Sequence, residues 1–181
     1  HGHGAVVLGS ECSGGIKDLT VEKCYFYNTD RGLRIKTRRG RGESMIIDGI
    51  VFENIIMDHV KVPLVANMYY FCDDDGKTPY VWSKEALPID EKTPFLGKFT
   101  FKNIKATNAH AAAGFFYGLK EMPIEAIRIK KVKIDFTENI LRNYGNVSHL
   151  GIQAPPGIEF YINSGESTIS VGSTGIYELD L

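Results

Sequence analysis

The sequence has little cysteine, almost no net charge and no long hydrophobic run. Its three cysteines, Cys12, Cys24 and Cys72, fit neither a disulfide framework nor the spacing of a metal site, so we expect buried free thiols. A formal net charge of −1 over 181 residues indicates no general attraction to nucleic acid or to a membrane surface. No apolar stretch reaches the roughly 20 residues of a membrane-spanning helix, so no membrane span is expected.

What the chain does have is an apolar pattern that recurs four times, starting at residues 19, 50, 99 and 127. Each copy alternates apolar and polar residues, skips one residue and alternates again, which predicts two short strands that meet at a bend. The apolar positions are Leu19, Val21, Cys24 and Phe26; Ile50, Phe52, Ile55 and Met57; Phe99, Phe101, Ile104 and Ala106; and Ile127, Ile129, Val132 and Ile134. Repetition at such intervals is typical of a solenoid, and the long interval between the second and third copies fits a coil with an inserted loop.

Further short strands are predicted between the copies. They are Ala5–Leu8, Gly32–Lys36, Leu64–Tyr70 and Ala113–Leu119. About three short strands per coil, stacked on equivalent strands above and below, predict an all-β fold, a partial parallel β-helix. Prolines exclude the segment 72–94 from central strands, so we expect it to form an inserted loop over one face of the solenoid. A β-sandwich is the competing fold, but the preserved offsets favour the solenoid.

Arg34 and Lys36 are candidates for binding an anion. Alternation within the strand Gly32–Lys36 places these two cations side by side on one face. A solvated strand face is the simpler interpretation, but in a groove the pair suits an acidic sugar, because Arg offers a fork to a carboxylate and Lys a point charge. His3 lies one coil earlier between two glycines, which leave room for an imidazole in the floor of such a groove.

These motifs resemble glycoside hydrolase family 28, the polygalacturonases. The similar segments are Gly2–Gly4, Gly9–Glu11 and Thr29–Gly42, with Asn67–Cys72 and Ala113–Leu119 similar to the bacterial branch of the family. The resemblance covers about the first 140 residues, in the right order. It implies a right-handed parallel β-helix that hydrolyses α-1,4-linked galacturonate in pectin with inversion, needs no metal or cofactor, and is secreted or periplasmic.

The same resemblance implies roles for three residues, and the sequence departs from the family pattern in one respect. His3 would be the catalytic-site histidine near the catalytic carboxylates, and Arg34 and Lys36 would hold the substrate carboxylate. The family places an Asn-Thr-Asp motif and an Asp-Asp pair before the Gly-His-Gly triplet, and these aspartates act as general acid and base. Nothing precedes His1 here, so we expect a chain that begins in mid-protein and that alone is inactive or nearly so.

Three charged motifs are interpreted as unrelated to catalysis. Asn28–Asp30 spells the family triplet, but at a place where the family has a turn, so an Asx-type turn is expected. Asp73–Asp75 lies in the insertion, where we expect it to be solvated or to bind a stray cation. The basic run Arg38–Arg41 is expected to add positive potential at the groove edge rather than to bind nucleic acid, because no stacking aromatics are interleaved with it.

The family pattern fades near residue 146, which we take as the end of the β-helix. Residues 147–181 are interpreted either as a divergent final coil that caps the solenoid or as an appended β-rich module, loosely similar to modules of phage tail proteins. We expect the open edge of the N-terminal coil to allow self-association. Two alternatives to a hydrolase of polygalacturonate stay open: a non-catalytic module that binds acidic polysaccharide, and a calcium-dependent pectate lyase. The sequence does not distinguish endo from exo action.

Overall fold

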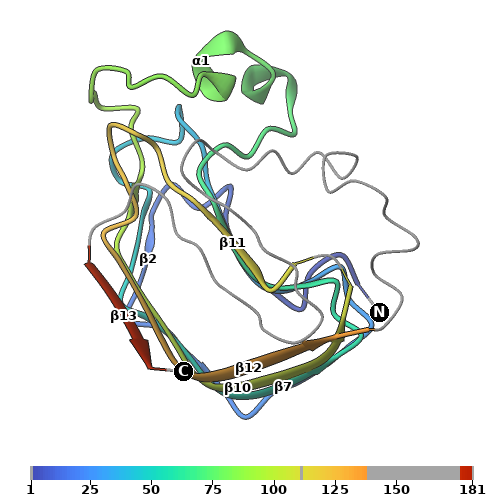
Figure 1. Ribbon diagram of the computed structural model, residues 1–181. Helices are drawn as coiled ribbons and strands as arrows, with labels where there is room; N and C mark the ends of the chain where they lie inside the picture. Colours follow the sequence, from blue (N-terminus) through green and yellow to red (C-terminus); the bar gives the residue numbers. More distant parts are fainter. Residues whose placement is uncertain (1, 111, 138–175, 181) are drawn as a thin grey trace.

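The computed structural model describes residues 2–110, 112–137 and 176–180, the last of these as backbone only. The strands in these ranges form three parallel sheets, which lie on three sides of a coil in Figure 1. Each turn of the chain adds a strand beside the equivalent strand of the previous turn. This arrangement is the parallel β-helix that the repeat predicts. In the part that the structure describes, no helix is long and apolar enough to cross a membrane.

The first sheet has the strand order β1-β5-β8-β11. Its strands are β1 (Val6–Leu8), β5 (Arg31–Lys36), β8 (Val62–Asn67) and β11 (Gly114–Tyr117). The four strands predicted between the repeat copies are therefore confirmed, with differences at their ends. Leu33, Ile35, Leu64 and Ala66 are fully buried and anchor this sheet in the core. Strand β1 lies at the edge of the sheet, and self-association along this edge stays a prediction.

The second sheet contains the repeat itself, in the order β13-β12-β10-β7-β3, with β4 also paired to β7. Its strands are β3 (Thr20–Glu22), β4 (Tyr25–Tyr27), β7 (Ile50–Asp58), β10 (Lys98–Ala109), β12 (Ala126–Phe136) and β13 (Ile176–Asp180). Repeat positions pair in register, so that Phe101 lies between Phe52 and Ile129. The Phe52 and Phe101 rings stack with centroids 5.4 Å apart, so successive coils interlock within the core.

The residue that each repeat copy skips forms the bend. Lys23, Asn54, Asn103 and Lys131 have φ between 51° and 55°, which is the left-handed region that Asn tolerates better than most residues. The Asn103 amide donates a hydrogen bond of 2.6 Å to Asn54 Oδ1 across adjacent coils. In the first copy the bend separates β3 from β4. In the later copies the chain continues through the bend as one strand, so the prediction of two separate strands is wrong there.

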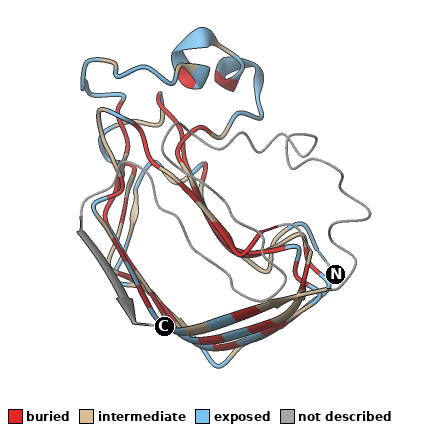
Figure 2. Ribbon diagram, viewed as in Figure 1, coloured by how far each residue is buried: buried red, intermediate tan, exposed pale blue. Residues whose placement is uncertain are grey.

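The sequence does not reveal the strands of the third sheet, which are too short for alternation to show. They are β2 (Ile16–Lys17), β6 (Ile46–Asp48) and β9 (Phe95–Leu96). Ile47 and Leu96 pair across this sheet and are fully buried. Buried residues follow all three sides of the coil, as Figure 2 shows, so one apolar core runs through the solenoid.

The insertion, residues 72–94, lies beyond one end of the strands, at the top of Figure 1. It contains a short 3-10 helix, η1 (Asp74–Gly76), and one turn of helix, α1 (Pro79–Trp82). Its exclusion from the sheets agrees with its prolines. The cysteines are free, as expected, but their burial is not as expected: Cys72 is exposed, and Cys12 and Cys24 are half-buried.

The predicted domain boundary at residue 146 lies outside the described residues, and so does most of the predicted cap or module. Of that region the structure describes β13, which pairs in parallel with β12 and extends the second sheet. The boundary, and the choice between a cap and an appended module, stay predictions.

Candidate functional site

The two predicted anion-binding residues lie together on the outer face of the first sheet. Because the inward residues of β5 are fully buried, alternation turns Arg34 and Lys36 outward. On the neighbouring strand β8 they are in register with Val65 and Asn67. Parallel strands are about 4.8 Å apart, so these four residues form a compact patch of the sheet. A rigid strand therefore presents two neighbouring cations to one side of the coil.

Tyr70 completes this patch. The guanidinium carbon of Arg34 lies 5.3 Å from the centre of the Tyr70 ring, and the Nζ of Lys36 lies 4.3 Å from it. An aromatic face within about 6 Å attracts a cation, so the ring holds both side chains in place. Burial and then the charge of Arg31 lower the pKa of Arg34, and burial and then the charge of Arg34 lower the pKa of Lys36. Two partly desolvated cations this close favour an added anion.

His3 lies at the start of the same sheet, just before β1, and contacts a carboxylate on the next coil. Its Nδ1 is 2.9 Å from Asp30 Oδ2, and Asp30 Oδ1 is 2.7 Å from the Nζ of Lys61. Hydrogen bonds from Lys61 and then from His3 lower the pKa of Asp30 to about 2. Asp30 is therefore ionised at neutral pH and orients the imidazole. The segment Asn28–Asp30 lies between β4 and β5 with a φ of 53° at Asn28, so the Asx-type turn stays a prediction, but the Asp30 carboxylate also binds side chains of the coils on either side.

The structure brings Arg34 and Lys36 together but pairs His3 with Asp30 rather than with these cations. Asp30 connects the two groups electrostatically, since its charge opposes the lowering of the pKa of Arg34. It precedes Arg34 by four residues along the same stretch of chain. The three predicted site residues therefore belong to one sheet, with the imidazole at the start of the strands and the cations further along.

A third cation reaches this sheet from the insertion. The Nζ of Lys84 lies 3.3 Å from the centre of the Tyr69 ring and 4.4 Å from that of the Tyr117 ring. Tyr117 is two strands from Lys36 and in line with it, because both are in register with one residue of β8. Burial and then the charge of Arg39 lower the pKa of Lys84 to about 8. Lys84 thus extends the cationic outer face along the axis of the coil.

Arg38 and Arg39 of the basic run do not line a groove edge. Arg38 and Arg39 are 2% and 1% exposed, so the expectation that they add surface potential is wrong. Arg39 donates hydrogen bonds of 2.6 Å and 2.9 Å to the Glu121 carboxylate and three more to carbonyl oxygens of the insertion. Arg38 donates a 2.6 Å bond to Asp75, so the acidic motif Asp73–Asp75 also holds the insertion in place.

Sequence reasoning missed Tyr70, Asp30 and Lys84 as parts of this site. A signal for Asp30 exists: it follows His3 at the same spacing as Leu33 follows Val6, and those two residues are in register on adjacent coils. No comparable spacing points to Lys84, because it lies in the irregular insertion. Among the described residues, no group of three or more His, Cys, Asp or Glu could hold a metal ion.

The family model of glycosyl hydrolases family 28 matches residues 1–149. The chain belongs to this family. The match covers the whole described coil apart from β13, and it agrees with the resemblance of the Gly-His-Gly and Arg-Ile-Lys motifs.

Several curated polygalacturonases are similar in sequence. An exopolygalacturonase of Arabidopsis thaliana is 34% identical over 66% of this chain and 24% of its own length. The Arabidopsis polygalacturonase QRT2 is 31% identical over 74% of this chain and 28% of its own length, and an exo-poly-alpha-D-galacturonosidase of Dickeya chrysanthemi is 37% identical over 58% and 16%. The chain thus spans about a quarter of these plant relatives. A comparison with solved structures finds no match.

Proposed function

We propose that the outer face of the first sheet binds galacturonate units of an acidic polysaccharide, and that the complete protein hydrolyses α-1,4-galacturonosyl linkages with inversion. The observation that carries this proposal is the pair Arg34 and Lys36, held side by side against Tyr70. Family membership and the names of the relatives, which are polygalacturonases, support the same substrate class.

Each residue of the site has a distinct role in this proposal. Arg34 donates two parallel hydrogen bonds to a substrate carboxylate, and Lys36 adds a point charge to it. Tyr70 keeps both cations in position and offers its ring to the sugar. His3, oriented by Asp30, presents its remaining ring nitrogen to the substrate near the bond that is cleaved.

The general acid and base come from carboxylates outside this site in the proposal. Inverting hydrolysis needs one protonated carboxylic acid and one carboxylate on opposite sides of the bond. Asp30 does not fit the acid role, because a pKa of about 2 leaves it ionised at any pH at which pectin is degraded. Since the chain spans about a quarter of its plant relatives, we place the two carboxylates in other parts of the complete protein.

Substitutions on β5 test the binding half of the proposal. Arg34→Ala and Lys36→Ala should each weaken binding of trigalacturonate at least tenfold, measured by calorimetry, since a hydrogen bond to a charged group contributes about 1.5–3 kcal/mol. Tyr70→Leu should weaken binding two- to fivefold, whereas Tyr70→Phe keeps the ring and serves as the matched control. Unchanged affinity in both alanine variants would place the substrate elsewhere.

Turnover tests the hydrolytic half. New reducing ends should form from polygalacturonate with the complete protein, and 181 residues alone should give little or no product. His3→Ala should lower kcat more than it changes KM if His3 acts near the reacting bond.

A non-catalytic binding module is the second candidate. The pKa of Asp30, lowered to about 2 by Lys61 and His3, favours it, because the site then holds substrate at neutral pH without a general acid. Galacturonate binding without turnover in the complete protein would establish it. The pectate lyase alternative predicts an unsaturated product that absorbs ultraviolet light and disappears on chelation; membership of a hydrolase family weighs against it. We also propose a secreted or periplasmic location, testable by fractionating the producing cells.

A further inference from the structure

The outer face of the second sheet is divided by charge. Strands β3, β4 and β7 carry three acidic residues and no Lys or Arg. Strands β10 and β12 carry six lysines, one arginine and a single acidic residue, Asp135. The basic half lies on a different side of the coil from β5 and β8, so it is not an extension of the site with Arg34 and Lys36 (Figure 1).

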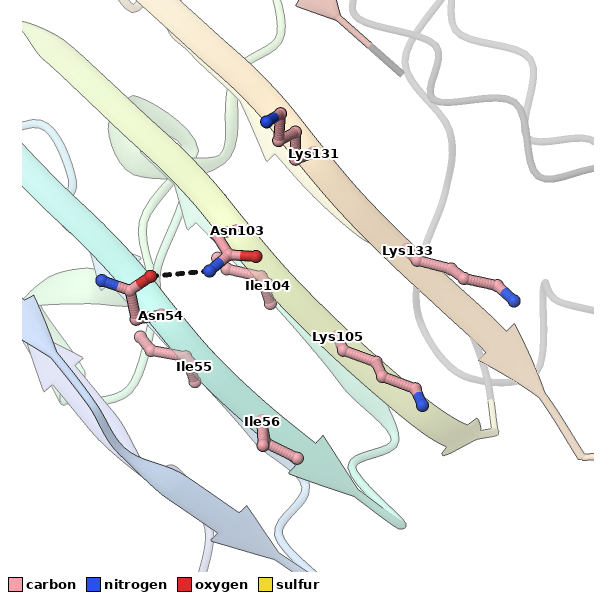
Figure 3. Close-up of a pocket in the computed structure, with 8 residues that line it drawn as sticks. All are labelled: Asn54, Ile55, Ile56, Asn103, Ile104, Lys105, Lys131 and Lys133. Atoms are coloured by element: carbon pink, nitrogen blue, oxygen red, sulfur yellow. Dashed lines mark hydrogen bonds between the residues drawn. The ribbon is translucent and has the colours of Figure 1, made fainter.

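A shallow hollow with a volume of about 310 Å³ lies where the basic strands β10 and β12 adjoin β7. Lys105 of β10 and Lys131 and Lys133 of β12 line it, together with the paired amides of Asn54 and Asn103 (Figure 3). Lys105 and Lys133 are in register on adjacent strands, and their side chains run in the same direction in Figure 3. Exposed Ile56 supplies an apolar patch at the rim.

Stability of the coil does not account for these lysines. Like charges directly opposite each other on neighbouring strands are destabilising, and Lys105 and Lys133 form such a pair. Protection of an open sheet edge does not apply to Lys105, because β10 is paired on both sides. In the described ranges, no carboxylate lies within ion-pair distance of the Lys105 or Lys131 ammonium, and the acidic partner of Lys133, Asp135, is 3.5 Å away on its own strand.

We propose that this hollow is a second, non-catalytic binding site for acidic polysaccharide. Carboxylates along one chain of sugar units would neutralise the lysines, the amides of Asn54 and Asn103 would bind hydroxyl groups, and Ile56 would contact a sugar face. Neighbouring strands are about 4.8 Å apart, so Lys105 and Lys133 follow one another along the coil axis, as suits an extended polymer. The identity of the polyanion as galacturonan rests on the proposed function.

The test separates this site from the first one. In an Arg34→Ala/Lys36→Ala background, we would measure binding to polygalacturonate by affinity electrophoresis. This double variant is the starting protein, and adding Lys105→Gln, Lys131→Gln and Lys133→Gln to it gives the hollow variant. The hollow variant should bind about tenfold more weakly than the starting protein, since three exposed ion pairs of about 0.5 kcal/mol each combine to that factor. The matched control replaces Lys17, Lys77 and Lys92 by Gln, which removes the same charge from exposed positions elsewhere in the described chain.

Equal loss in the hollow variant and in the control variant would overturn the proposal, because net charge alone would then explain binding. Equal binding of duplex DNA and polygalacturonate by the starting protein would overturn it too, since the hollow would then be a general polyanion surface. If the hollow variant weakens binding while Arg34→Ala/Lys36→Ala does not, the second site stands and the proposed function fails. If Lys105→Gln, Lys131→Gln and Lys133→Gln, introduced into the complete protein with Arg34 and Lys36 intact, leave turnover of trigalacturonate unchanged, the two sites are independent, as expected.

Discussion

Arg34 and Arg39 lie five residues apart in the sequence, and the protein uses their charges in opposite ways. Arg39 is 1% exposed, and its donors are taken by Glu121 and by carbonyl oxygens of the insertion. Arg34 lies half-buried against the Tyr70 ring, and among the described residues no carboxylate is within salt-bridge distance of it. An arginine with filled donors is structural, whereas one with open donors on a rigid strand is available to a ligand.

The difference follows from what comes after β5. Alternation in the strand turns Arg34 outward, but the chain leaves the strand after Lys36 and passes under the insertion. There the guanidinium of Arg39 bridges segments that are otherwise far apart in the sequence. Neighbouring cations in the sequence therefore do not all lie on one surface. Whether each is exposed or buried depends on its position relative to the strand.

The largest effect is expected at Arg39. Arg39→Met leaves the Glu121 carboxylate, which is 5% exposed, without its partner, and such a change costs about 3–5 kcal/mol of unfolding free energy. Denaturant unfolding would measure it. Arg34→Met is the matched substitution, and it should change stability by less than about 1 kcal/mol, because the Arg34 donors have no buried partner.

A double substitution sharpens the result. Arg39→Met combined with Glu121→Met should recover part of the loss, since no buried charge is then left unpaired. If Arg34→Met destabilises the protein as much as Arg39→Met, the two arginines have the same role and the comparison fails.

The parts of the fold that follow local alternation could be predicted from the sequence. The repeat offsets place Phe52, Phe101 and Ile129 in register because equivalent residues of successive coils stack on each other. The same alternation places Arg34 and Lys36 on one face, as the structure has them. Positive φ at the skipped residue also follows the repeat, and Asn occupies two of its four positions.

The contacts between the coil and the insertion could not be predicted. Arg39 and Glu121 are 82 residues apart, and no period or motif relates them. The surface interpretation of Arg38 and Arg39 failed for this reason, since charge alone does not reveal a buried partner. Lys84 was missed for the same reason, because its aromatic partners, Tyr69 just after β8 and Tyr117 of β11, meet the insertion only in the folded chain.

The next largest effect is expected at Lys84, a cation that, like Arg34, lies against aromatic rings and is available to a ligand. With a pKa of about 8, Lys84 is a neutral amine in roughly half of the molecules at pH 8. Brief acetylation should therefore modify Lys84 about tenfold faster than Lys77, an exposed lysine of the same insertion. Mass spectrometry after a short pulse of reagent would measure the ratio. Bound polygalacturonate should slow the reaction of Lys84 but not that of Lys77.

Tyr117→Ala is the control for the cause of this reactivity. Removing one ring that covers Lys84 exposes the ammonium to water, so its pKa should rise and its acetylation at pH 8 should slow. Equal rates for Lys84 and Lys77 in the unaltered protein would mean that burial does not shift Lys84, and Lys84 would then be an ordinary surface lysine.

The smallest effect concerns the carboxylate that orients His3. The folded pKa of Asp30, about 2, lies below its ordinary value of 3.8, so its ionised form stabilises the fold above about pH 4, and this contribution is lost as the pH falls towards 2. Because the partners Lys61 and His3 are exposed, the contribution is at most about 1 kcal/mol. The difference in unfolding free energy between wild type and Asp30→Asn should therefore shrink between pH 5 and about pH 2. In a Lys61→Met background the difference in unfolding free energy caused by Asp30→Asn should already be smaller at pH 5, since Lys61 contributes most to the low pKa of Asp30. If this difference does not depend on pH in either background, Asp30 acts through its shape rather than its charge.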